Sequence, residues 1–137
     1  MSRPDYSGQV APTVEDFEAM AADAYKALPE RFRVRTGGVV IRIADFPEPD
    51  VLKELGLESE FDLLGLFQGV GLAHDGAVPQ TGQMPNMVFL YRRPILDYWA
   101  EHEQTLGEIV THVLVHEIGH HFGLSDEDME AIEAATA

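Results

Sequence analysis

The stretch HEIGHHFGLSD, residues 116–126, is predicted to combine the end of a helix, a turn and the start of a second helix. His116 and His120 are four residues apart, so on an α-helix both imidazoles can reach one ion at about 2.0–2.1 Å. Glu117 points to one side of this pair, where it can act as a general base toward a metal-bound water. Gly123 can take the left-handed conformation that ends a helix, which allows Asp126 to become the third ligand. Three protein ligands and one open position are typical of catalytic zinc, whereas structural zinc has four.

The helix that carries this motif is predicted to lie in the centre of the domain. Thr105 and Glu108 form a capping box at its start. The residues between this box and the motif are apolar on nearly every side, which is typical of a buried helix. Buried histidines and glutamates need polar partners, and a metal ion would supply them. The apolar positions of this helix are Ile109, Val110, Val113, Leu114, Val115 and Ile118.

Two further histidines lie beside the motif. His112 is one turn before His116 on nearly the same face, and we interpret it as a core histidine satisfied by hydrogen bonds rather than as an outer group of the metal site. His121 faces away from the metal-binding edge and is left out of the ligand set. Asp126 could alternatively be a carboxylate that interacts with the dipole of the last helix, a role compatible with binding the metal.

Periodicity and turn residues place the other elements. Val39, Ile41 and Ile43 alternate along a mostly buried strand. Gly65 in a second strand indicates a bulge or a close approach by another element. The segment from Val70 to Asn86 is predicted to be a long loop, either functional or disordered. We expect helices at 13–28, 51–55 (capped by Asp50), 94–102, 105–121 and from Ser125 onward, and strands at 39–46, 61–69 and 87–91.

Composition limits the classes of function. The chain has 137 residues, with nine basic against twenty-four acidic ones and a net charge of −15, which argues against binding nucleic acid or anionic membranes. The absence of cysteine excludes disulfides and thiolate zinc ligands. The N-terminus lacks the apolar core of a signal peptide, so a cytoplasmic location is expected. We expect residues 1–12 to be a flexible arm and 13–137 to be a single domain, and we favour a monomer.

The motif HExxHxxGxxD, at positions 116–126, resembles the metzincin-type signature with aspartate in place of the third histidine, as in the small snapalysin-like peptidases. Over residues 13–135 the chain is similar to the minimal zincin-like metallopeptidases of bacteria. Supporting matches are LLGLFQGV at 63–70 and FLYRRPIL at 89–96. The resemblance implies an α+β minimal zincin-like fold, in which a small sheet of about three strands packs on helices that include the HExxH helix. Unlike metzincins, the chain lacks a methionine-containing turn, and Met129 is expected to serve packing.

The resemblance also implies a zinc-dependent peptidase acting on a peptide or an unfolded protein. His116, His120 and Asp126 would bind Zn²⁺, and Glu117 would be the general base. Glu130 or Glu133 could replace Asp126 as the third ligand, although the position of Gly123 favours Asp126. A substrate could bind along strand 87–91 or 63–68, and the candidates for stabilising the oxyanion are Tyr91, His74 and Arg92. The alternative function is a zinc-binding interaction module that cleaves nothing efficiently.

Overall fold

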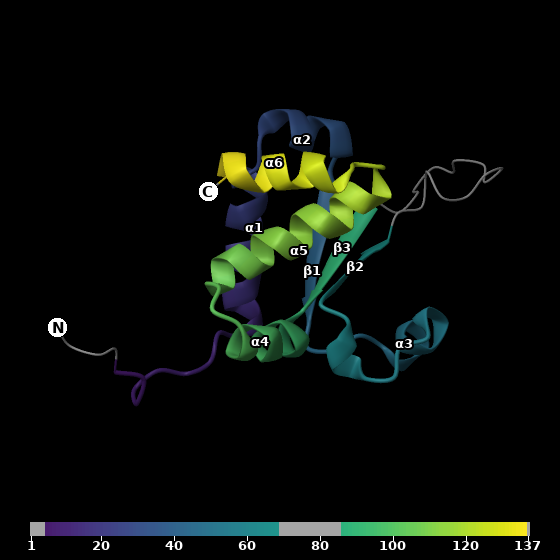
Figure 1. Cartoon of the computed structure of the whole chain (residues 1–137). Coiled ribbons are helices and arrows are strands. Elements are labelled where there is room, and N and C mark those ends of the chain that lie inside the picture. The colour runs from purple at the N-terminus through teal and green to yellow at the C-terminus, as the bar shows by residue number, and fades with distance from the viewer. Residues whose placement is uncertain (1–4, 69–85, 137) are drawn as a thin grey trace.

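The computed structural model describes residues 5–68 and 86–136. Within these ranges the chain forms six α-helices, one short 3₁₀-helix and a mixed three-stranded sheet, so the predicted α+β class is confirmed (Figure 1). The predicted loop from 70 to 86 falls almost wholly outside the described residues, apart from Asn86, which begins a strand. No helix in the described ranges is long and apolar enough to cross a membrane.

The sheet has the order β1-β3-β2. Its strands are β1 (Val39–Ala44), β2 (Gly65–Gln68) and β3 (Asn86–Tyr91). The central strand β3 pairs with β1 in parallel and with β2 in antiparallel orientation. Residues 87–91 are therefore flanked on both sides, and the prediction that they could be an edge strand for a substrate is wrong. The predicted strand 61–69 begins instead with the 3₁₀-helix η1 (Glu60–Asp62), and only its second half is a strand.

The predicted starts of two helices agree with the structure to different degrees. Helix α1 (Val14–Ala27) begins directly after Thr13, as predicted, and the side chain of Thr13 forms a capping box with Asp16. In helix α3 (Pro49–Leu55) Glu48 rather than Asp50 occupies the N-cap position, without a side-chain hydrogen bond, and Pro49 lies in the first turn, where a missing N–H costs nothing. Two further helices precede the motif helix. They are α2 (Glu30–Thr36), which we did not predict from the sequence, and α4 (Arg92–Glu101).

The core lies between one face of the sheet and helices α1 and α5 (Leu106–His121). Val88 and Leu90 of β3 are fully buried in this core, and Val110, Leu114 and Ile118 of α5 are equally buried. The predicted central position of the motif helix is therefore confirmed. Side chains alternate along a strand, so Phe89 and Tyr91 project from the opposite face of the sheet, where their rings stack at 6.3 Å.

Helix α6 (Asp126–Thr136) packs along the C-terminal half of α5 (Figure 1). Gly123 has the left-handed backbone predicted for it, with φ of 75°, and the amide of Leu124 donates to the carbonyl of Gly119 at 2.9 Å. Met129 is fully buried, and a side chain on Gly119 would meet its sulfur at 2.6 Å. Met129 thus serves packing, as expected, and this close contact fixes α6 beside the histidines of α5.

Candidate metal centre

The turn after α5 brings Asp126 to His116 and His120. One potential ligand atom from each of the three residues lies within 4.8 Å of the other two. The Nε2 atom of His120 is 3.9 Å from Oδ1 of Asp126. Ligand atoms around a tetrahedral zinc ion are about 3.3 Å apart, so a small rotation of these exposed side chains would close the set. Two imidazoles and one carboxylate form a donor set that suits Zn²⁺.

His116 is the central residue of the site. Burial lowers the pKa of its imidazole below the usual value, and the adjacent His112 lowers that pKa further, while Glu133 opposes the shift. The ring of His116 is therefore neutral at pH 7, which is the protonation state that binds a metal ion.

Glu117 faces the sheet rather than the metal-binding edge of α5. Burial raises the pKa of its carboxyl above the usual value, while the positive charge of His120 and the backbone N–H of Phe67 in β2 act in the opposite direction. A side chain on Gly65 would approach the Cγ of Glu117 to 3.4 Å, so β2 and α5 are in close contact here. The close approach predicted from Gly65 is confirmed. Glu117 is thus a half-buried carboxylate between the edge strand and the second histidine of the motif.

A second group of potential metal ligands lies one turn earlier on α5. It consists of His112, His116 and Glu133, with ligand atoms again within 4.8 Å of one another. His112 Nδ1 is 3.0 Å from Oε1 of Glu133, and His116 Nε2 is 3.2 Å from Oε2. The prediction that His112 is a core residue is wrong, because its side chain is 53% exposed, although it does have the expected hydrogen bond. The i, i+4, i+8 spacing of His112, His116 and His120 is the sequence signal for this group.

The remaining candidates lie away from the ligand atoms. His121 stacks on Phe67 with ring centroids 4.0 Å apart and belongs to neither group, as predicted. Arg92 donates to the carbonyl of Pro12 at 2.6 Å and pairs with Asp45 at 3.0 Å.

Of the two other oxyanion candidates, His74 lies outside the described residues. Tyr91 is 3% exposed, and burial, together with the negative charges of Glu48 and Glu117, raises its pKa to about 12. Its hydroxyl therefore stays protonated, but it projects from the sheet face that does not pack on α5.

Comparison with known proteins identifies the family. A search of curated proteins finds no significant match. The model of one family, described as zincin-like metallopeptidase, matches residues 36–136. The match includes all three strands, the motif helix α5 and the helix α6 that carries Asp126 and Glu133. The chain belongs to the zincin-like metallopeptidase family.

Proposed function

We propose that the protein is a zinc-dependent peptidase with Glu117 as its general base and His116, His120 and Asp126 as its metal ligands. The main support is the position of Glu117, which lies against Gly65 of β2 and near His120 and does not belong to either group of ligand atoms. A carboxylate in this position is free to exchange a proton while the three other side chains hold the ion.

A zinc ion held by His116, His120 and Asp126 would supply polarisation of the scissile carbonyl and a more acidic water. The role of Glu117 is to take the proton of the attacking water and to pass it to the leaving amine. The burial that raises the pKa of Glu117 makes it a stronger base than an exposed carboxylate. The side chain of Glu117 lies where α5 contacts Gly65 of β2, so we expect the proton transfer to take place between the edge strand and α5.

The substrate is proposed to be a peptide in extended conformation. Among the described residues, β2 pairs only with β3, which leaves its outer edge open beside Glu117. A peptide that adds to this edge would form backbone hydrogen bonds and pass the carboxylate of Glu117. Extended backbone is accessible to unfolded segments and not to helices, so unfolded proteins are the expected substrate class.

The test compares hydrolysis of a quenched peptide library by the zinc-loaded protein and by Glu117→Gln. Glutamine has nearly the size of glutamate and Glu117 belongs to neither ligand group, so we expect unchanged zinc binding and a loss of hydrolysis of about 100-fold or more. Glu130→Gln is the matched control, because Glu130 is an exposed glutamate outside both ligand groups. Hydrolysis that persists in Glu117→Gln would contradict the role of general base.

A non-catalytic zinc-binding module remains the second candidate function. The exposure of His120 and Asp126, whose side chains are 60% and 84% accessible, favours it because a deep cleft does not enclose them. Such a module needs the ligands but not Glu117. Zinc binding with equal lack of hydrolysis by the wild-type protein and Glu117→Gln would support this alternative.

A further inference from the structure

We propose that His112, His116 and Glu133 form a second zinc-type metal site, an alternative to the set of His116, His120 and Asp126. The two sets share one imidazole, so an ion that completes one set takes the middle ligand from the other. The second site would hold the ion one helical turn away from Glu117.

The distances from Glu133 to the two imidazoles are close to those between ligands of one ion. Nitrogen or oxygen ligands at about 2.0–2.1 Å from a tetrahedral zinc are about 3.3 Å apart. Oε1 of Glu133 lies 3.0 Å from His112 Nδ1 and Oε2 lies 3.2 Å from His116 Nε2, whereas His120 Nε2 and Asp126 Oδ1 are 3.9 Å apart. The carboxylate of the second set is therefore nearer to its imidazoles than Asp126 is to His120.

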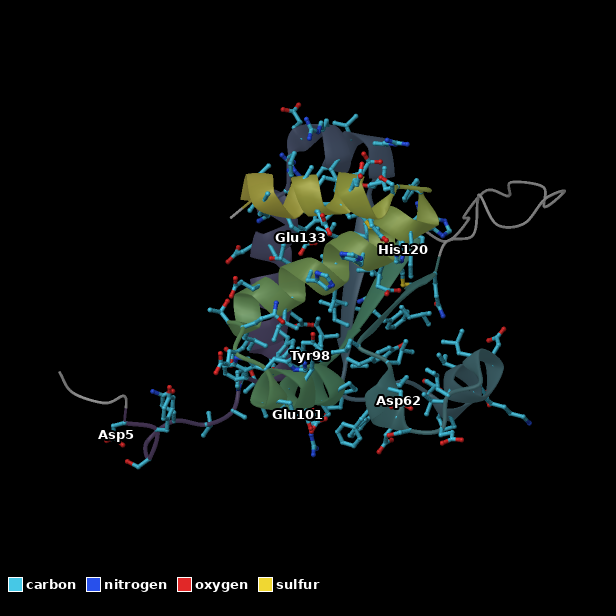
Figure 2. The ribbon with its side chains drawn as sticks, viewed as in Figure 1. Asp5, Asp62, Tyr98, Glu101, His120 and Glu133 are labelled. Carbon is cyan, nitrogen blue, oxygen red and sulfur yellow. The ribbon has the colours of Figure 1, made fainter. Side chains whose placement is uncertain are left out.

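Glu133 is also the better fixed of the two carboxylates. Its side chain is 24% exposed, against 84% for Asp126, and each of its oxygens already faces one imidazole. The rings of His112 and His116 lie with their centroids 3.9 Å apart, so their nitrogens approach the carboxylate from neighbouring turns. Figure 2 shows Glu133 where α6 faces α5, and His120 nearer the end of α5. A carboxylate that needs no ordering loses little entropy on binding a metal.

An ion can reach this set from solvent because the side chain of His112 is 53% exposed. An open hollow of about 520 Å³ between α1, α5 and α6 also reaches Glu133, although neither histidine lines it, and Asp23 and Glu108 do. These carboxylates make the approach attractive to cations. Two imidazoles and one carboxylate favour Zn²⁺ and related transition-metal ions over Mg²⁺ or Ca²⁺, which prefer oxygen ligands.

An ion in the second site would be poorly placed for catalysis. With about 100° per residue along a helix, Glu117 is rotated by about 60° from His120 but by about 140° from His112. Moving the ion from the first set to the second therefore turns it away from the proposed general base. The second site is thus an alternative position for the metal, in which His116 stays a ligand and the other two ligands differ from those of the first set.

The test measures zinc affinity by competition with a chromophoric chelator, using the full chain. The double variant His120→Ala/Asp126→Ala disrupts the first set and leaves the second intact. Both side chains are mostly exposed, so their loss removes little packing. We expect this variant to bind one zinc ion. Adding His112→Ala should lower its affinity by about 100-fold or more, because a direct ligand is lost.

The control adds His102→Ala to the same double variant. His102 is an exposed histidine at the end of α4 whose ring contacts Tyr98, and it belongs to neither set. We expect this change to leave zinc affinity unaltered. In the double variant, zinc should also shift the ¹⁵N resonances of the His112 ring. Equal zinc affinity with and without His112, or no response of its ring, would overturn the proposal. Because neither readout depends on hydrolysis, an inactive protein would not affect the result.

Discussion

At the residue scale, the buried carboxylate of Glu117 lowers the stability of the metal-free protein at neutral pH. Its carboxyl has a higher pKa in the folded chain than the ordinary value of 4.5 because it is buried. The folded state therefore holds the proton to higher pH than the unfolded state does. The free energy of unfolding therefore falls as the pH rises from the ordinary pKa to the raised one. Above the raised pKa this loss reaches its full size, because the carboxyl is then ionised in both states.

We therefore expect Glu117→Gln to be more stable than the wild-type chain at pH 7 in the absence of metal. Glutamine cannot ionise and has nearly the size of glutamate, so it fills the same space without a buried charge. The gain should disappear near pH 4, where the wild-type carboxyl is protonated. Urea unfolding in the presence of a chelator at both pH values measures the difference. A variant less stable than the wild type at pH 7 would mean that the carboxylate contributes an attraction that outweighs its burial.

The sequence predicted some features of the site and missed others, and the difference has a physical reason. The spacing of His116 and His120 and the left-handed turn at Gly123 are local properties of the helix and its end, so both were readable directly. The contact between His112 and Glu133 joins residues 21 positions apart. It depends on how α6 packs on α5, which the 3.6-residue period of either helix does not specify.

At the scale of elements, the approach of α5 to β2 depends on Gly65. A Cβ at this position would lie 2.6 Å from Cγ1 of Val113 and 3.0 Å from the carbonyl oxygen of Phe89. We expect Gly65→Ala to lower the free energy of unfolding by about 1–3 kcal/mol, because the added methyl must push the helix from the strand. It should also reduce hydrolysis, since Glu117 lies at this contact.

Gly107→Ala provides the matched control for this substitution. Gly107 is in the first turn of α5, and a Cβ there would meet nothing within 4 Å. Alanine favours the helix, so this change should raise stability by up to about 1 kcal/mol. Urea unfolding of the two variants measures both effects. If Gly65→Ala proved as stable as the wild type, the close packing of α5 on β2 would not require glycine at position 65.

Among the elements, capped helices were predicted well and the sheet less well. The capping box predicted at Thr105 is present, and Thr13 and Ser125 form boxes at the predicted starts of their helices, because each box is formed by residues three positions apart. Strand order is a long-range property, and nothing in the segment 87–91 indicated that it would lie between two partners. The missed helix α2 follows Pro29 directly, and its seven residues are too few to display a clear period.

At the scale of the whole molecule, metal binding should be coupled to stability. The ligands come from α5 and from α6, and these helices hold together through the contact of Met129 with Gly119. An ion that binds to residues of both helices favours the folded chain over the unfolded one. At a free zinc concentration of 100 times Kd, the stabilisation is about 2.7 kcal/mol. For a chain of this size that corresponds to a rise in Tm of roughly 10 °C.

The control for this effect is His116→Ala, because His116 is common to both sets of ligands. A thermal scan of the wild-type protein should show the rise in Tm with zinc and its reversal by a chelator. The rise should be largely absent in His116→Ala, whereas His120→Ala/Asp126→Ala should retain part of it through the second set. An equal rise in His116→Ala would mean that zinc stabilises the chain from a location outside the α5–α6 pair, since neither set can be completed without this residue.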